Sequence, residues 1–525
     1  MWFLCSIIAH ELQFHPRLTS TIISTSTKRP KVFAYVKFDL DALIILATRL
    51  RGQSCTVDTS TRPKAGSTHW AIFITFEDGV EWVFRSPRRG LSAIITEESA
   101  SKLLISEAST LKYLRALGSI LVPEVFSFSG DGDNDIGVPY ILMSKASGRP
   151  LSDYDWIELS QMEGYPNRRP LLPMTDRDRE KVMAQLGTIM SRLSDTHFDK
   201  IGSLFQDNKD NYFVSECLSP SLIWQHRDEL EGFDRGPFDQ ESQYLRSLIS
   251  AFTAHAEEFS LSPHSFFAPI PDPFDYPNWA SYCKAVDRWQ AFCSIGDKIE
   301  GNKNRLDFCI AAQFLTEMVP HLVWAEEPFV LCHPDLHRGN IFVDEDFNIT
   351  CIIDWSSASA GPAAELLSIP GLNGSFSPPK PSLVAAFRSG FRNGSQALGP
   401  QQCKRADKLW YFLRLVRMLS TQDYALFKSL FDLVYNKNSD DIPQLFHDRS
   451  MQESGQALLA KLCQGDSEEE EDETTQKDNN DGQASVSVDV IVARKLTLIS
   501  EMNTNFVADK RLWLWIENVL ETLDV

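Results

Sequence analysis

Apolar and polar positions follow two periods along this chain, and the change of period separates a small first part from a larger second part. Between residues 39 and 146, short strand-like runs stand on both sides of a long stretch with helical spacing. Beyond residue 170, most apolar positions recur at helical spacing. The pattern predicts a small α+β lobe followed by a mainly helical one.

The first part predicts one helix before two pairs of strands and a second helix between the pairs. A helix is expected at residues 39–50, because its first turn is acidic and an arginine stands near its end. Another is expected at 97–117, where leucines recur at helical spacing before Gly118, a typical C-cap. Strand pairs are expected at 71–76 with 81–85 and at 122–129 with 139–146, joined by the turn-forming stretches EDG and GDGDNDIG.

The second part predicts helices with a few strands among them. The helices are expected at 175–198, with Thr175 as N-cap, and at 305–323, 406–435 and 508–525, the third of these as one helix or two. Strand-like runs occupy Phe329–Cys332, Asn340–Val343 and Ile349–Ile353, with the turn DEDFN between the last two. Residues 205–300 are rich in aromatic residues and prolines, and the pattern places no regular element there.

Length and charge limit the possible functions. The 525 residues are too many for one ordinary core and predict two or three lobes. The formal net charge is −20, which argues against nonspecific nucleic-acid binding. Residues 465–482 hold nine acidic residues and one lysine, so they supply −8 of this charge and are expected to be disordered. The ten cysteines include no C-x-x-C pair, which favours reduced thiols.

No segment has the pattern of a signal peptide or a membrane span. The apolar residues 1–9 lack a basic front and a cleavage pattern, and they are too few to cross a bilayer. Residues 17–31 are basic, rich in Ser and Thr and free of acid, which resembles an organelle transit segment. A disordered leader and a misplaced start codon are the alternatives. We expect a cytoplasmic protein without a membrane partner, with the mitochondrion as the alternative location.

The stretch VLCHPDLHRGNIFVDEDFNITCIIDW, residues 330–355, concentrates polar residues between apolar runs. Asp335 and Asn340 stand at the two ends of a short loop between predicted strands, and Asp354 ends the next strand. A hairpin would bring Asn340 close to Asp354, and such oxygen ligands suit a hard divalent cation. Asp335 would then orient a hydroxyl and accept its proton. The alternative is that Asp335 and Asn340 only cap the loop through Asx-type hydrogen bonds.

The spacing H-x-D-x-x-x-x-N, from His333 to Asn340, matches a kinase catalytic loop, and IID stands where a metal-binding Asp belongs. The segment resembles the aminoglycoside phosphotransferase (choline kinase-like) family, which has H-G-D-L-H-x-G-N followed by I-D-W or I-D-F. LSDTHFDKIGSLF resembles its fungal-type branch, and the likeness covers roughly residues 39–420. The resemblance implies a bilobal protein kinase-like α+β fold with a small β-rich N-lobe, one main helix in that lobe, and a larger helical C-lobe.

The resemblance also implies roles for single residues. Asp335 matches the catalytic base, Asn340 and Asp354 match the Mg²⁺ ligands, and Glu107 matches the glutamate that braces a phosphate-contacting cation. That cation is a lysine in the family, whereas the strand EWVFR offers Arg85. Arginine holds phosphate bidentately but places its charge differently. Alternatively, Arg85 and Glu107 are surface charges of a strand end and a helix.

Further residues are expected around the nucleotide. The stretch KAGSTHW would supply the phosphate loop with Gly66, Ser67 and Thr68, and backbone groups of Met143, Ser144 and Lys145 would meet the adenine edge near the hinge. His333 is expected to support the loop through hydrogen bonds, and His337 either packs in the loop or lies near the substrate.

These interpretations combine into one plan of the chain. A leader at 1–38 precedes an N-lobe at 39–145, a C-lobe at 146–440, and a helical extension at 441–525 with a disordered acidic insert at 465–484. The predicted activity is ATP- and Mg²⁺-dependent phosphoryl transfer to a small-molecule hydroxyl. A protein kinase is disfavoured, because no long activation segment or A-P-E follows Asp354. The alternative is a nucleotide-binding pseudokinase or scaffold, which Arg85 and the single-glycine phosphate loop would favour.

Overall fold

The computed structural model describes the following residues: 33, 37–65, 68–88, 95–156, 171–224, 226–258, 280–282, 285, 302–324, 328–370, 372, 380–394, 400–416, 423–437, 441–462, 493, 496 and 510–521. They belong to two compact units. Unit 1 takes its residues from 1–229, 234–244 and 323–410, and unit 2 takes the rest. Of the predicted leader, only residues 33, 37 and 38 are described, and the predicted acidic insert lies outside the described residues. The predicted domain boundaries stay a prediction.

The N-terminal part of unit 1 is an antiparallel sheet with strand order β1-β3-β4-β6-β5, and β2 is paired to β3. The strands are β1 Cys55–Val57, β2 Lys64–Ala65, β3 His69–Phe76, β4 Glu81–Pro87, β5 Val125–Ser129 and β6 Tyr140–Ser144. Alternate residues of β3 and β4 are buried, as in Trp70 and Phe84, whose rings meet Phe38. The other face therefore carries His69 and Arg85. Both predicted strand pairs are confirmed.

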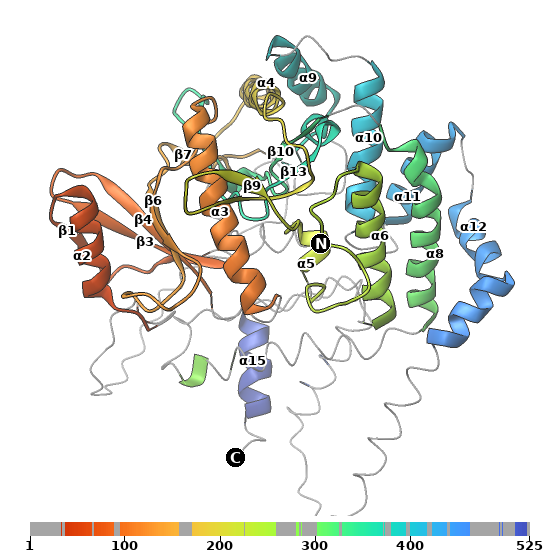
Figure 1. Cartoon of the computed structure of the whole chain (residues 1–525), viewed down its shortest axis with the longest axis horizontal. Coiled ribbons are helices and arrows are strands. Elements are labelled where there is room, and N and C mark those ends of the chain that lie inside the picture. Colours follow the sequence, from red (N-terminus) through yellow and green to blue (C-terminus); the bar gives the residue numbers. More distant parts are fainter. Residues whose placement is uncertain are drawn as a thin grey trace, which may run out of the picture. The chain divides into compact units, whose positions relative to one another are not determined.

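Two helices of this lobe begin and end within one residue of the predicted bounds. Helix α2 (Leu40–Arg51) starts after Asp39, whose side chain accepts from the Ala42 N–H. Helix α3 (Glu97–Leu117) starts after Thr96 and stops at Gly118, which has φ +68°. Leucines of α3 pack in the same core as Ile141 and Met143 of β6. This packing fixes the helix beside the sheet (Figure 1).

The C-terminal part of unit 1 rests on two helices that cross very closely. Helix α4 (Asp176–Leu193) begins with a capping box at Thr175 and ends five residues before the predicted end. Helix α9 (Pro381–Gly394) lies beside it (Figure 1). A Cβ on Gly187 would stand 2.0 Å from Phe387 O, and a Cβ on Gly390 would stand 1.8 Å from Ala184 O. Only glycine permits this separation of the two backbones.

Two small sheets complete this part. One has the order β10-β13-β8-β9 and the other β12-β11-β7. Their strands are β7 Arg149–Pro150, β8 Gly202–Gln206, β9 Tyr212–Val214, β10 Phe329–Cys332, β11 Ile341–Val343, β12 Ile349–Ile352 and β13 Ser359–Pro362. The predicted strand Asn340–Val343 is corrected at its start, because Asn340 closes the 3₁₀ turn η8 (Arg338–Asn340).

The sequence pattern missed the regular elements between residues 202 and 258. Besides β8 and β9, these are α5 (Pro220–Ile223) and α6 (Glu241–Glu258). Strand β8 pairs with β13, whose residues lie far along the chain. Such a pairing leaves little local signal. Helix α10 (Pro400–Leu415) belongs to unit 1 as far as Trp410.

Unit 2 is mainly helical in its described residues, and it takes α6 from Leu245 onward and α10 from Tyr411 onward. It holds α8 (Asn302–Met318), followed by the turn η7 (Val319–His321), then α11 (Asp423–Tyr435), α12 (Ile442–Ser450) and α15 (Lys510–Glu521). The rings of Phe314, Phe427 and Phe446 meet in its core. The predicted stretch 406–435 thus contains two helices, α10 and α11.

Two further observations, on membrane-spanning helices and on cysteines, apply to the described residues alone. None of the helices given above is long and apolar enough to span a membrane. All cysteines among the described residues are free and buried. They are Cys55, Cys217, Cys309, Cys332, Cys351 and Cys403.

Candidate active site

The loop after β10 is held by backbone hydrogen bonds and two histidines. The Asp335 N–H donates to His333 Nδ1 at 3.2 Å, and the Gly339 N–H donates to His337 Nδ1 at 2.9 Å. His333 Nε2 lies 3.1 Å from Ile353 O, so this nitrogen carries the proton and donates. Burial lowers the pKa of His333, which keeps the ring neutral. Both ring nitrogens of His333 thus contact backbone groups, those of Asp335 and Ile353.

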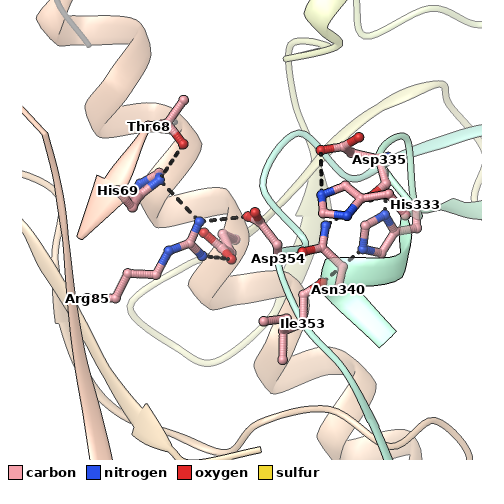
Figure 2. Close-up of polar contacts among 10 residues, drawn as sticks. Thr68, His69, Arg85, His333, Asp335, Asn340, Ile353 and Asp354 are labelled. Carbon is pink, nitrogen blue, oxygen red and sulfur yellow. Dashed lines mark hydrogen bonds and ion pairs between the residues drawn. The ribbon is translucent and has the colours of Figure 1, made fainter. Parts of the chain in front are cut away.

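The hairpin β11–β12 brings Asn340 and Asp354 to one edge. Ile341 pairs with Ile352, and the Ile353 N–H donates to Asn340 O at 3.0 Å. The buried Asn340 side chain donates through Nδ2 to Asp335 O at 2.9 Å, and in Figure 2 its other end points toward Asp354. Asp354 has φ +62°, a conformation rare for residues other than glycine. This turn directs its carboxylate away from the strand.

Asp335 is the most accessible carboxylate of the loop. Its side chain is 42% exposed, and Oδ2 lies 3.7 Å from His337 Nε2. Because Nδ1 of His337 accepts from Gly339, its Nε2 carries a proton and faces Asp335. Asp335 is thus open to a group that approaches from solvent.

The Arg85 side chain connects strand β4 to helix α3 and to Asp354, which follows the β11–β12 hairpin. Its Nη1 donates to Glu107 Oε1 at 2.5 Å, and its Nη2 donates to Asp354 Oδ1 at 2.6 Å (Figure 2). The Glu107 side chain is only 1% exposed, so it is not the surface charge considered above. The structure brings Arg85 to Glu107, as the resemblance implied, and adds the contact with Asp354.

Two carboxylates share this one cation, and their pKa values move apart. Burial raises the pKa of Glu107 to about 7, against the effect of Arg85. For Asp354, burial is outweighed by the Arg85 guanidinium, which lowers the pKa to about 2. Burial also opposes the charge of Arg85, but Asp354 and Glu107 raise its pKa. The arrangement holds an ionised Asp354 next to a permanent positive charge.

The side chains of Asn340 and Asp354 suit Mg²⁺ better than they suit a metal ion whose ligands all come from the protein. Among the described residues, no group of three His, Cys, Asp or Glu side chains could hold a metal ion. Asn340 and Asp354 offer one amide oxygen and one carboxylate at the same edge. Mg²⁺ is usually bound by one or two carboxylates together with waters and substrate phosphates. The residues therefore fit this ion.

The predicted nucleotide-contacting residues are only partly described. Gly66 and Ser67 lie outside the described residues, whereas Thr68 lies next to β3, with Oγ1 2.8 Å from His69 Nδ1. The Ser144 N–H donates to Glu124 O at 2.8 Å, and the Lys145 N–H donates to Glu81 O at 3.4 Å. An adenine contact of the segment Met143–Lys145 would have to use other backbone groups.

Sequence reasoning missed His69, whose Nδ1 lies 3.1 Å from Arg85 Nη2. Ala71 is the cross-strand partner of Arg85, and His69 lies two residues earlier on the same face of β3. The alternation of the strands, once their register was set at the EDG turn, was the signal that could have revealed it.

It also missed the groups that hold α3 in place. The Thr96 N–H and hydroxyl both donate to Asp228 Oδ2, at 2.8 and 2.7 Å. Further along, Lys102 pairs with Glu216 at 2.7 Å. Helix α3, which carries Glu107, is thus tied to the segment after β9 as well as to the sheet.

The fold and this arrangement define a two-lobed kinase-like protein. The model of the phosphotransferase enzyme family, APH, matches residues 61–395, more than half of the chain. The chain therefore belongs to the phosphotransferase enzyme family. Membership supports small-molecule phosphotransferase activity.

Known relatives are distant. The chain is 25% identical over 278 residues to a subtelomeric hrmA-associated cluster protein of Aspergillus fumigatus, covering 49% of this chain and 50% of that one. It is 22% identical over 338 residues to altered inheritance of mitochondria protein 9 of Eremothecium gossypii, covering 60% and 51%. The chain thus spans about half the length of the curated relatives it matches. Macrolide 2′-phosphotransferase MphH of Brachybacterium faecium aligns with a TM-score of 0.36, 16% identity, and coverage of 76% and 100%.

Proposed function

We propose that the protein transfers the γ-phosphoryl group of ATP to a hydroxyl of a small molecule in a Mg²⁺-dependent reaction. The observation that carries the proposal is the hairpin edge, where Asp335, Asn340 and Asp354 meet opposite the Arg85–Glu107 pair. Phosphoryl transfer needs an acceptor hydroxyl held in position, a group that takes its proton, and concentrated positive charge. Asp335 would serve the first two needs, and Arg85 supplies positive charge.

Asp335 is the proposed base. It accepts the proton of the acceptor hydroxyl as that oxygen bonds to the γ-phosphorus and the bond from phosphorus to the bridging oxygen breaks, leaving ADP. Its exposed position gives an acceptor access to it, and His337 lies beside it. Arg85 is proposed to contact the phosphates, braced by Glu107.

Asn340 and Asp354 are the proposed magnesium ligands. Bound Mg²⁺ supplies positive charge that offsets the charge of the phosphate oxygens. Asp354 is ionised and oriented for this role by Arg85 and by the turn at φ +62°. Thr68, the undescribed Gly66 and Ser67, and the segment Met143–Lys145 complete the proposed nucleotide contacts.

A pseudokinase or scaffold is the second candidate. It is favoured by the contact of Arg85 with Asp354, because a proposed metal ligand is already paired with a protein cation. In this case nucleotide would bind without transfer. The intact set of Asp335, Asn340 and Asp354 favours the enzyme.

Thermal unfolding and transfer assays separate the candidates. Unfolding temperatures are measured with ATP, with ATP and Mg²⁺, and without ligand. ADP formation is then followed with water alone and with amino-alcohols, amino sugars and polyols as acceptors. For the enzyme we expect a Mg²⁺-dependent shift and a transfer that Asp335→Asn abolishes. Asp346→Asn is the matched control, because Asp346 lies exposed in the turn of the same hairpin.

The other outcomes decide between the alternatives. A shift without ADP formation, unchanged in Asp335→Asn, identifies a pseudokinase. The absence of any shift would contradict both candidates. We further propose a cytoplasmic location with no nucleic-acid partner. The mitochondrion is the alternative, because the Eremothecium gossypii relative is named as mitochondrial and residues 17–31 resemble a transit segment. Cell fractionation tests it.

A further inference from the structure

His69 contacts the cation of the candidate site from the strand next to it. It begins β3, on the face that carries Arg85, and lies between Thr68 and the guanidinium in Figure 2. Its Nδ1 lies 3.1 Å from Arg85 Nη2 and 2.8 Å from Thr68 Oγ1. Arg85 Nη2 therefore stands between a carboxylate, Asp354, and an imidazole nitrogen.

The chemistry of arginine fixes the state of this imidazole. A guanidinium can only donate, so Nδ1 must accept and the ring proton must be on Nε2. The Thr68 hydroxyl is then a second donor to the same nitrogen. Burial, followed by the charge of Arg85, lowers the pKa of His69 to about 3, which keeps the ring neutral. His69 is thus a neutral acceptor facing a permanent cation.

The contact answers a problem that arginine creates at this position. A lysine ammonium is a compact charge whose three donors rotate freely, whereas a guanidinium is a planar fork with donors in fixed directions. Glu107 and Asp354 hold Nη1 and Nη2. A third partner on the strand side restrains rotation of the plane about the line that joins the two carboxylates.

We propose that His69 is a positioning residue that orients the Arg85 guanidinium for the nucleotide phosphates, an inference that rests on the proposed function. His69 acts through Arg85 and does not itself contact the reacting atoms. The requirement is specific to arginine, so His69 matters with Arg85 and ceases to matter with a lysine at this position.

The first test does not depend on nucleotide. In protein labelled with ¹⁵N-histidine, His333 and His337 also give signals of the Nε2–H tautomer. We expect a further signal of this tautomer that is lost in His69→Asn and displaced in Arg85→Lys. An Nδ1–H tautomer for His69, or a signal that Arg85→Lys leaves in place, would overturn the proposal. This reading stands even if the protein neither binds ATP nor transfers phosphate, in which case the proposed function fails by itself.

The second test measures KM and kcat with ATP. His69→Leu removes the acceptor at similar volume, and we expect KM for ATP to rise about tenfold, as for one lost hydrogen bond to a charged group. His69→Asn places an oxygen near the position of Nδ1 and should restore most of the loss. In the Arg85→Lys background, His69→Leu should change KM by less than about twofold. Exposed His197→Leu is the control.

Two results of the kinetic test would overturn the proposal. One is an equal rise of KM in the wild-type and Arg85→Lys backgrounds, and the other is a failure of His69→Asn to restore binding although it melts at the wild-type temperature. Unfolding temperatures of all variants without ligand are recorded for this purpose. If His69→Leu does not fold, His69→Asn and the spectra decide.

Discussion

In the loop and hairpin from His333 to Asp354, backbone groups hold most of the polar side chains, whereas Arg85 and Glu107 on the other side of the site are held by charge. Asn340 and both histidines of the loop are fixed by N–H and carbonyl groups of nearby residues. Arg85 is fixed by Glu107, Asp354 and His69, which come from other elements.

This difference separates two kinds of substitution. A side chain in the loop that is held by backbone hydrogen bonds can be replaced by one without its reactive group while the loop keeps its shape. Its neighbours do not depend on its charge. A charge-held group supports its partners, and its removal leaves buried carboxylates without compensation. We expect variants of the loop to affect turnover, and variants of the charge cluster to affect stability and nucleotide binding.

The largest expected effect on stability is that of Arg85→Met. It leaves Glu107, which is only 1% exposed, without its cation, and we expect the free energy of unfolding to fall by about 3 kcal/mol. Urea unfolding at neutral pH measures this, with Arg85→Lys as the control that keeps a charge. An unchanged midpoint of urea unfolding for Arg85→Met would mean that the ion pairs of Arg85 do not stabilise this part of the site.

The next prediction concerns helix α4, which supports the β11–β12 hairpin. Gln185 of α4 accepts from the Ile349 N–H at 2.9 Å, so α4 carries the hairpin. Gly390→Ala would place a Cβ 1.8 Å from Ala184 O and push α9 away from α4. We expect a loss of about 2 kcal/mol in urea unfolding. Ser389→Ala, on the exposed side of α9, is the control and should change little. A similar loss in both variants would contradict this account of the helix contact.

A smaller effect is expected where α3 is tied down. Asp228→Ala removes the acceptor for both donors of Thr96, and we expect about 1 kcal/mol less stability. Because α3 carries Glu107, hydrogen exchange of its first turn should also become faster. Asp228→Asn keeps one acceptor oxygen and should lose less. Unchanged exchange in Asp228→Ala would show that the sheet alone fixes α3.

The smallest expected effect concerns Lys145, at the predicted hinge. The Lys145 side chain pairs with Glu81, lies 5.0 Å from the centre of the Phe73 ring, and is 44% exposed. An exposed pair contributes about 0.5 kcal/mol, so Lys145→Ala should change stability by no more than that. ATP affinity, measured by titration calorimetry, should stay nearly constant, because the proposed adenine contacts come from the backbone. A large loss of affinity would assign the contact to the side chain.

The contrast between the two sides also explains what could be predicted from the sequence. The loop side was predictable because its groups lie within one short stretch and their spacing sets the geometry. Helix ends such as Thr96–Gly118 and the start at Thr175 follow from local caps. The Arg85–Asp354 contact joins residues 269 positions apart, and no local pattern encodes it. The same holds for β8 with β13 and for Thr96 with Asp228.

Local strain was equally invisible. Asp354 ends a strand-like run, and although Asp adopts positive φ more often than most residues, the sequence pattern did not single out this position for φ +62°. The turn exists because tertiary contacts, above all the Arg85 ion pair, support a conformation that the isolated residue would rarely adopt. His69 was predictable in principle, since strand alternation and register place it beside Arg85.

The most direct test of the account compares Asp335→Asn with Arg85→Met in one experiment. ATP affinity is measured by calorimetry with Mg²⁺ present, and ADP formation is measured on the same samples. We expect Asp335→Asn to bind ATP like the wild type but to form ADP about 10²- to 10⁴-fold more slowly. We expect folded Arg85→Met to lose ATP affinity. Equal loss of affinity in the two variants, or full turnover in Asp335→Asn, would contradict this account.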